Sequence, residues 1–138
     1  MLYKIQLVIL LLFSVSTFLW AQENGNFTDM ACKFITHNRC VIHCEQQPEN
    51  LLFLETVDGK NLSILCLWFP QTETGEYRLE EISSSLASKM DYVLIGYGQT
   101  PKNPMYCYWL SAKKASKKLN IEKLEKYRLP LPLSDFCF

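Results

Sequence analysis

Two apolar runs in the middle of the chain predict a pair of β-strands. Residues 51–57 and 61–69 are rich in leucine, isoleucine and aromatic side chains, and the polar sequence Asp58-Gly59-Lys60 separates them. An Asp-Gly pair between two such runs is typical of a tight hairpin turn, because the central positions of that turn need positive φ angles. Both faces of the second run are apolar, so we expect a central strand that is covered on both sides.

The following residues predict further short strands joined by turns. Residues 76–82 alternate polar and apolar side chains, which is typical of a strand with one solvated face. Residues 92–98 and 105–110 are apolar and aromatic, and Gly96 indicates a bend or a close approach of another segment. Residues 99–104 hold the Pro, Asn and Thr residues of a turn. The pattern predicts a mainly β fold, built as a meander of antiparallel strands.

The last thirty residues predict a short helix followed by an extended tail. The apolar positions before and after Leu119 lie on opposite helical faces, so one continuous helix would expose one of the two sets. We therefore expect a break near Leu119, with Asn120 as the N-cap of a short helix that ends near Arg128. Pro130 and Pro132 then stop the helix and favour an extended chain.

The N-terminus indicates secretion. Lys4 precedes a nearly unbroken apolar stretch, and the polar run that starts at Gln22 follows Ala21. This is the pattern of a secretory signal peptide, which we place at residues 1–21, with an uncleaved signal anchor as the alternative. Residues 22–138 then form one secreted, extracellular domain, in which no second apolar run reaches membrane-spanning length.

Charge and composition narrow the classes of function. The chain has 138 residues, of which 49% are hydrophobic, and this favours a single globular domain. Fourteen Lys and Arg residues balance fourteen Asp and Glu residues. The absence of excess positive charge argues against nucleic acid as a partner, because nucleic-acid binding needs a basic surface.

The cysteines predict a disulfide-bonded domain. An even number of cysteines in an oxidising compartment favours three disulfides. A metal site built from Cys40, Cys44 and the nearby His37 and His43 is the alternative, but the chain lacks the second ligand pair of a usual zinc site. The six cysteines are Cys32, Cys40, Cys44, Cys66, Cys107 and Cys137.

Two N-glycosylation motifs agree with secretion. Asn26 stands before Phe-Thr in the polar leader, and Asn61 stands before Leu-Ser directly after the predicted hairpin turn. Asn26 is the better candidate, and we expect the turn to keep Asn61 exposed.

The order of these elements resembles the C-terminal part of a lipocalin. The resemblance is carried by residues 75–79 (Gly-Glu-Tyr-Arg-Leu), 90–97 with Asp91-Tyr92, 106–111 (Tyr-Cys-Tyr-Trp-Leu-Ser) and the cysteine next to the C-terminus. It implies a lipocalin-like β-barrel with a short C-terminal helix outside it. The Gly-X-Trp motif of the first lipocalin strand is absent from residues 22–69, so we expect a partial or shortened barrel.

The lipocalin resemblance also implies a disulfide between Cys66 and Cys137. The other two bridges would then form among Cys32, Cys40, Cys44 and Cys107. In that arrangement Cys107 pairs with Cys32 or Cys40 and anchors the N-terminal segment.

The resemblance implies that the protein carries a small hydrophobic ligand in the barrel. The alternative is a secreted, disulfide-rich module that binds a cell-surface or extracellular protein through the N-terminal cysteine-rich segment and has no small-molecule cavity. The candidate cavity-lining residues are Phe53, Trp68, Tyr77, Leu79, Tyr92, Leu94, Tyr106 and Tyr108.

Catalysis is not expected. The chain has two histidines and none of the common nucleophile, phosphate-binding or metalloprotease motifs, and no motif requires a cofactor. Glu80 and Glu81 are neighbours on a predicted strand and therefore point to opposite faces. The lysines at 113, 114, 117 and 118 form a basic run, which we interpret as a solvated surface, with a weak site for a glycan or another anionic surface as the alternative.

Overall fold

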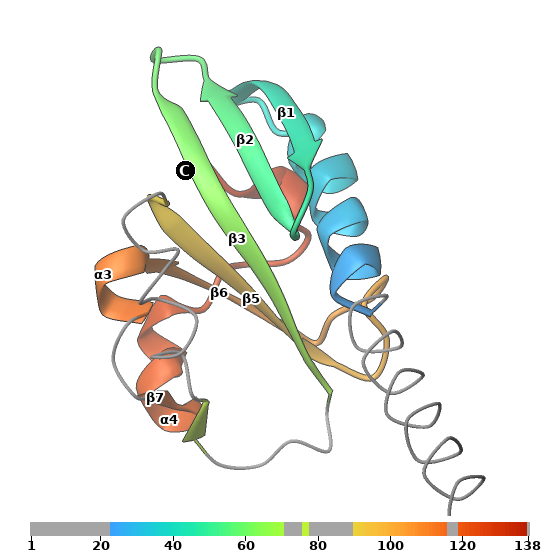
Figure 1. Cartoon of the computed structure of the whole chain (residues 1–138), viewed down its shortest axis with the longest axis vertical. Coiled ribbons are helices and arrows are strands. Elements are labelled where there is room, and N and C mark those ends of the chain that lie inside the picture. Colours follow the sequence, from blue (N-terminus) through green and yellow to red (C-terminus); the bar gives the residue numbers. More distant parts are fainter. Residues whose placement is uncertain (1–22, 71–75, 78–89, 116–118, 138) are drawn as a thin grey trace, which may run out of the picture.

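A five-stranded β-sheet forms the centre of the molecule (Figure 1). The computed structural model describes residues 23–70, 76–77, 90–115 and 119–137. In spatial order the strands are β1 (Val41–Gln47), β2 (Leu51–Thr56), β3 (Asn61–Pro70), β5 (Tyr92–Gly98) and β6 (Tyr106–Ser111). A separate pair consists of β4 (Glu76–Tyr77) and β7 (Leu119–Asn120). The predicted mainly β class is confirmed.

The predicted hairpin between β2 and β3 is also confirmed. Gly59 has a φ angle of 87°, which is a conformation that glycine adopts without steric cost. The backbone N–H of Thr56 donates to the carbonyl of Lys60 at 2.9 Å and closes the turn. The Thr56 hydroxyl donates to the Asp58 carboxylate, and this hydrogen bond, helped by the charge of Lys60, lowers the pKa of Asp58.

The sheet is mixed, because β3 and β5 run parallel. Ile64 lies opposite Tyr92 and Phe69 lies opposite Tyr97 in this pair. The predicted run of antiparallel strands is therefore wrong at this point. A parallel neighbour needs a crossover rather than a tight turn, and residues 71–91 supply a connection of that length. Among the described strands, β1 and β6 are the two edges and do not pair with each other.

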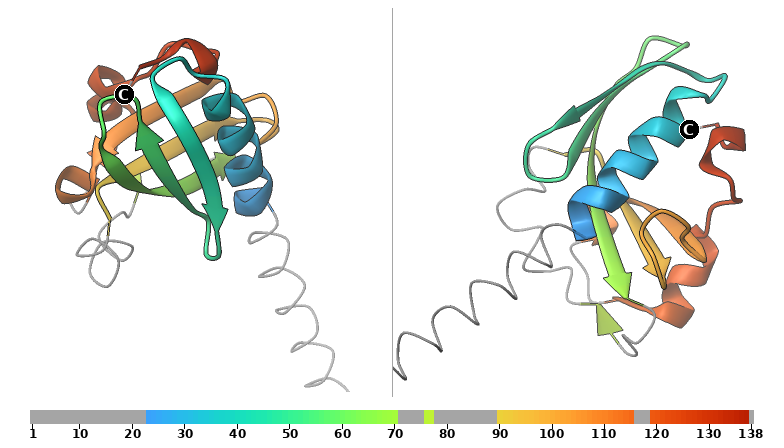
Figure 2. Two further views of the ribbon diagram at one scale, coloured as in Figure 1. Left: turned by 90° about the horizontal axis from the view of Figure 1, so that it is seen from above. Right: turned by 90° about the vertical axis from the view of Figure 1, so that its right-hand side faces the viewer.

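A helix over residues 23–36 covers one face of the sheet (Figure 2, blue). We name it the N-terminal helix. Its buried apolar residues, Phe27, Met30, Ala31 and Ile35, recur at the spacing of one helical face. This helix is not predicted from the sequence, where its start resembles a polar leader, because Asn, Gly and Thr residues with low helix propensity surround the apolar positions.

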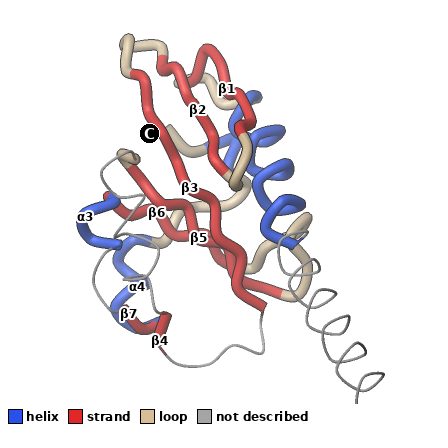
Figure 3. The backbone as a smooth tube through the Cα atoms, in the orientation of Figure 1, coloured by secondary structure: helices blue, strands red, loops and turns tan. Residues whose placement is uncertain are grey.

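The sheet is covered on both faces, as predicted for its central strand. Ile64, Cys66 and Trp68 of β3 belong to the core beneath the N-terminal helix. Leu65 and Leu67 belong to a second core on the opposite face. That second core includes buried residues of α3 (Ala112–Ala115) and α4 (Ile121–Leu124), which lie away from the N-terminal helix (Figure 3).

The predicted break near Leu119 is confirmed. The chain passes from α3 through β7 into α4, which begins directly after Asn120, and a 3₁₀ turn, Glu125–Tyr127, ends the helical segment before Arg128. A further 3₁₀ turn, Leu133–Asp135, lies in the C-terminal tail.

The N-terminal helix approaches the sheet most closely at Gly96 of β5. The Phe27 ring packs against Trp68 with 5.5 Å between ring centroids. A Cβ atom on Gly96 would lie 2.4 Å from the Phe27 ring and 2.9 Å from the Trp68 ring. The close approach expected at Gly96 is therefore confirmed, and the approaching group is the N-terminal helix.

The disulfide pairing differs from the pairing that the lipocalin resemblance implied. Cys137 is bonded to Cys40, with 5.4 Å between the two Cα atoms, and Cys66 is a buried thiol under the N-terminal helix. The predicted Cys66–Cys137 bridge is therefore wrong. The C-terminal tail passes the end of the helix, where Leu133 accepts a hydrogen bond from Asn38, and this path brings Cys137 to Cys40 rather than to mid-β3.

Some of the predictions fall on residues that the structure does not describe, and others concern the surface of the protein. The signal peptide, Leu79, and the pair Glu80 and Glu81 lie outside the described residues. Asn61 is exposed, as expected, and Asn26 is exposed as well; glycosylation of either asparagine stays a prediction. Within the described residues, no helix has the length and apolar character needed to cross a membrane.

We expect Gly96→Ala to lower the free energy of unfolding by about 1–3 kcal/mol, because the added methyl group would force Phe27 and Trp68 apart. Gly25→Ala is the matched control, since its added methyl group would have nothing packed against it within 4 Å and the residue is helical. The control should be neutral or stabilising by up to about 1 kcal/mol. Urea unfolding of both variants measures the difference, and equal stability would contradict this packing.

Candidate functional site

The residues predicted to line a cavity lie on opposite faces of the sheet. Trp68 and Leu94 are buried beneath the N-terminal helix, and the half-buried Tyr92 stacks on Trp109 on the same face. Tyr106 and Tyr108 belong to the core on the other face. Burial and the nearby charge of Glu125 raise the pKa of Tyr108 to about 12, as expected for a phenol packed in a core. These side chains therefore do not converge on one cavity.

Of the remaining predicted lining residues, only Phe53 has a described side chain. Phe53 is 45% exposed on β2. Leu79 lies outside the described residues, and only the backbone of Tyr77, in β4, is described. The N-terminal helix packs on the face of the sheet that carries Trp68 and Leu94.

Among the described residues, an apolar surface groove of about 290 Å³ lies beside the C-terminal tail. Three segments build it: the N-terminal helix, the turn between β5 and β6, and the tail. We name it the C-terminal groove. Its lining residues are Met30, Phe34, Lys102, Asn103, Pro104, Leu131, Pro132 and Leu133.

The helix wall of the groove consists of Met30 and Phe34, which are one helical turn apart and therefore lie on the same side of the helix. Met30 is buried and belongs to the core, whereas Phe34 is 40% exposed. Met30 therefore anchors this wall in the core, and Phe34 presents its aromatic ring to solvent.

The tail wall is tied to the end of the helix through Asn38. This side chain is 3% exposed; its Nδ2 atom donates to the Leu133 carbonyl at 3.5 Å, and its Oδ1 atom accepts from the Cys40 backbone N–H at 2.7 Å. The Cys40–Cys137 disulfide closes the same junction covalently. Figure 2 (right) shows the red tail beside the end of the blue helix.

The third wall is the turn between β5 and β6. The Asn103 N–H donates to the Thr100 carbonyl at 3.1 Å, and the Met105 N–H donates to the Tyr97 carbonyl at 2.9 Å. These bonds fix the loop that carries Lys102 and Pro104. Lys102 is the single ionisable residue among the groove-lining residues, so the groove is suited to apolar binding rather than to acid–base chemistry.

Another hollow, of about 450 Å³, lies beside the 3₁₀ turn of the tail. It is lined by His37, Arg39, Ser134, Asp135 and Cys137. The cysteine-rich segment that the sequence singled out therefore lies next to the C-terminal groove. Among the described residues, no group of three His, Cys, Asp or Glu side chains is arranged to hold a metal ion.

The basic run is only partly described. Lys113 and Lys114 are exposed on α3, and Lys114 lies 5.3 Å from the centre of the Tyr127 ring. A hydrogen bond from Lys114, together with the charge of Lys126, lowers the pKa of Tyr127. Lys117 and Lys118 lie outside the described residues.

Comparisons with known proteins return no match: no family model, no curated protein and no solved structure is similar to this chain.

Sequence reasoning missed the residues of the groove. A signal for its helix wall was present, because Phe27, Met30, Ala31 and Phe34 follow a helical spacing. The tail wall had no local signal, because the contact between Asn38 and Leu133 joins segments that are 95 residues apart.

We expect Asn38→Ala to lower the free energy of unfolding by about 1–3 kcal/mol, because it removes the partner of the Cys40 N–H and of the Leu133 carbonyl. Asn103→Ala, an exposed asparagine on the opposite wall, should change stability by less than about 0.5 kcal/mol. Urea unfolding compares the two variants. Equal effects would contradict the role of Asn38 as the link between helix and tail.

Proposed function

We propose that the protein is a secreted, disulfide-stabilised module that binds another extracellular protein through the C-terminal groove. One observation carries this proposal. Exposed apolar side chains from two distant segments, Phe34 (40% exposed) and Leu131 (41% exposed), meet at a groove whose walls are tied together by Asn38 and a disulfide. An apolar surface of this kind, held on rigid segments, is typical of a protein-binding site.

Side chains pack tightly between the N-terminal helix and the sheet. This packing favours a protein partner at the surface over a ligand held between the helix and the sheet. Phe27 and Trp68 occupy that face, and their rings leave no room for even one methyl group on Gly96. The groove lies next to the cysteine-rich segment, which the sequence alone had suggested as the binding region of such a module.

The groove also defines the chemistry of the partner. Its buried floor, with Met30 and Leu133, suits an aliphatic or aromatic side chain. Lys102 at the wall suits a carboxylate next to that side chain. We therefore expect the partner to present a short segment with an apolar anchor and a neighbouring Asp or Glu.

A second candidate function is carriage of a small hydrophobic molecule, as the lipocalin resemblance implied. The volume of the groove, about 290 Å³, supports this candidate because it is near the lower end of the range for small-molecule pockets. On this hypothesis the ligand lies in the groove and not within a barrel. Membership of the lipocalin family, the partial barrel and secretion itself stay predictions.

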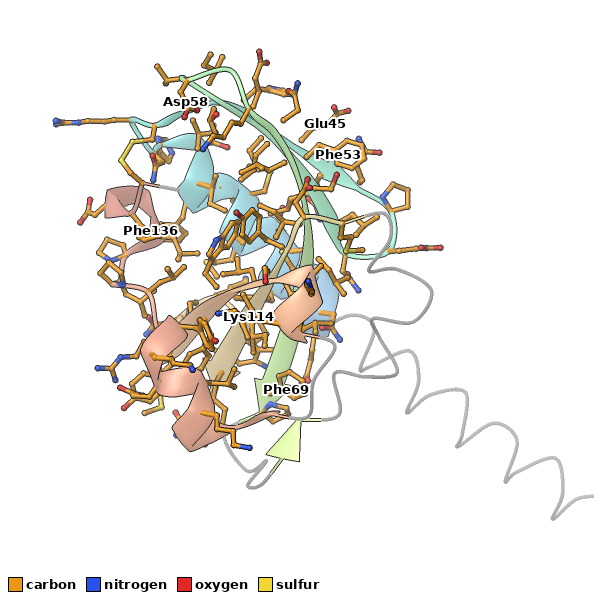
Figure 4. The ribbon with its side chains drawn as sticks, turned by 90° about the vertical axis from the view of Figure 1, so that its left-hand side faces the viewer. Glu45, Phe53, Asp58, Phe69, Lys114 and Phe136 are labelled. Carbon is orange, nitrogen blue, oxygen red and sulfur yellow. A yellow bond between two sulfur atoms is a disulfide. The ribbon has the colours of Figure 1, made fainter. Side chains whose placement is uncertain are left out.

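We expect the double variant Phe34→Ala, Leu131→Ala to lose at least tenfold in partner affinity, because truncating the apolar anchors of an interface costs more than about 1 kcal/mol each. Competition with fluorescently labelled wild-type protein for binding to intact cells of several types measures the loss. Phe53→Ala is the matched control, because Phe53 is similarly exposed. Figure 4 shows it across the molecule from Phe136 of the tail. Equal competition by both variants, or no saturable binding to any cell type, would contradict the proposal.

The two candidate functions differ in their response to an apolar fluorescent probe. A carrier should take up one probe per chain, and Phe34→Ala with Leu131→Ala should abolish this uptake. A protein-binding module should show weak uptake that does not saturate at one equivalent. Fluorescence titration of the wild type and of the double variant distinguishes them.

A further inference from the structure

Two thiols from different elements lie in contact beside the core. Cys32 is on the N-terminal helix and Cys44 is on β1, and their Sγ atoms are 3.2 Å apart. The Cys44 thiol donates toward the Cys32 sulfur, and the Cys32 thiol donates toward the Cys44 carbonyl at 3.5 Å. Both side chains are half-buried, so a reagent from solvent can reach them.

The remaining two thiols are not placed to pair with each other. Cys66 lies opposite Leu94 of β5, and Cys107 lies opposite Gly96 of the same strand. The whole of β5 therefore separates them. Two strand spacings amount to about 9.5 Å, which exceeds the roughly 7 Å limit between the Cα atoms of a disulfide.

We propose that Cys32 and Cys44 form a second disulfide, which binds the N-terminal helix to β1, and that Cys66 and Cys107 remain thiols in the folded protein. The mature domain then has two bridges and two buried thiols, instead of the three bridges expected from the even number of cysteines. The proposal does not depend on what the C-terminal groove binds.

The reaction is thiol–disulfide exchange with a small disulfide donor such as oxidised glutathione. One thiolate of the pair attacks a donor sulfur, the donor S–S bond breaks, and a mixed disulfide forms while the first donor thiol leaves. The second cysteine loses its proton and attacks the mixed disulfide, which releases the second donor thiol. The pair loses two electrons and two protons, and the donor is reduced to two thiols. The sulfur atoms need to approach by about 1 Å to reach bonding distance.

Burial keeps the other thiols out of this exchange. Cys66 and Cys107 are both 0% exposed. Burial raises the pKa of the Cys66 thiol, with a smaller contribution from the nearby Cys107, and raises the pKa of Cys107 to about 12. Burial and the hydrogen bond with Cys32 also raise the pKa of Cys44, so access separates the two sets of thiols: a donor disulfide reaches the half-buried Cys32 and Cys44 but not the buried Cys66 and Cys107.

The first test maps the thiols of the full mature chain refolded in a glutathione redox buffer. Alkylation after denaturation, without reduction, should label Cys66 and Cys107 and leave the other four cysteines unlabelled. Trypsin leaves Cys40 and Cys44 on one fragment, residues 40–60. The assignment therefore uses the Cys40→Ser, Cys137→Ser variant, in which that fragment should be linked to the peptide that contains Cys32. Labelling of Cys32 and Cys44, or a link from either to Cys66 or Cys107, would overturn the proposal.

The second test measures reductant sensitivity in the same background. In the Cys40→Ser, Cys137→Ser variant, dithiothreitol should lower the Tm by about 10 °C, because it opens the one remaining bridge. Adding Cys32→Ser and Cys44→Ser should remove this response. Cys107→Ala in the same background is the control and should keep it. A reductant response that persists without Cys32 and Cys44 would contradict the pairing, and so would no response when both are present.

Discussion

The packing of Phe27 against Trp68 over Gly96 is the contact on which the rest of the structure depends. A β-strand that carries side chains at every position keeps a helix at a distance, whereas Gly96 leaves the space that the Phe27 ring fills. Burying one such ring stabilises a fold by about 1.5–3 kcal/mol. The contact places the N-terminal helix directly on β3 and β5.

The position of the helix sets the path of the C-terminal tail. The helix ends near Thr36, and Asn38 follows with its backbone N–H bonded to the Ile35 carbonyl at 2.9 Å. This geometry directs the Asn38 side chain to both Cys40 and Leu133. The tail is also held earlier, where the Leu129 N–H donates to the Cys107 carbonyl at 2.8 Å on the edge of β6. One wall of the groove is therefore a consequence of where the helix stops.

Local signals predicted the parts of the fold that local physics determines. The hairpin at Gly59 and the break near Leu119 each follow from the conformational needs of a few neighbouring residues. The missing side chain of Gly96 indicated a close approach, but nothing nearby in the sequence indicated that Phe27 makes it. The parallel pairing of β3 with β5 and the Cys40–Cys137 bridge join segments far apart in the chain, and no short pattern specifies them. The groove depends on both local and long-range interactions. The helical spacing of apolar residues indicates its helix wall, whereas its tail wall forms only through tertiary contacts.

The anchoring of the tail and of the N-terminal helix explains how an apolar groove can remain open on the surface of the folded protein. Exposed apolar side chains on a free tail would collapse onto the nearest apolar surface, whereas Leu131 lies between two anchors, at Leu129 and at Leu133. Phe34 is held by a helix whose neighbouring turns are buried in the core. On the proposed function, these positions are ordered before a partner arrives, so binding would lose little further conformational entropy and the apolar contact would contribute more fully to the affinity.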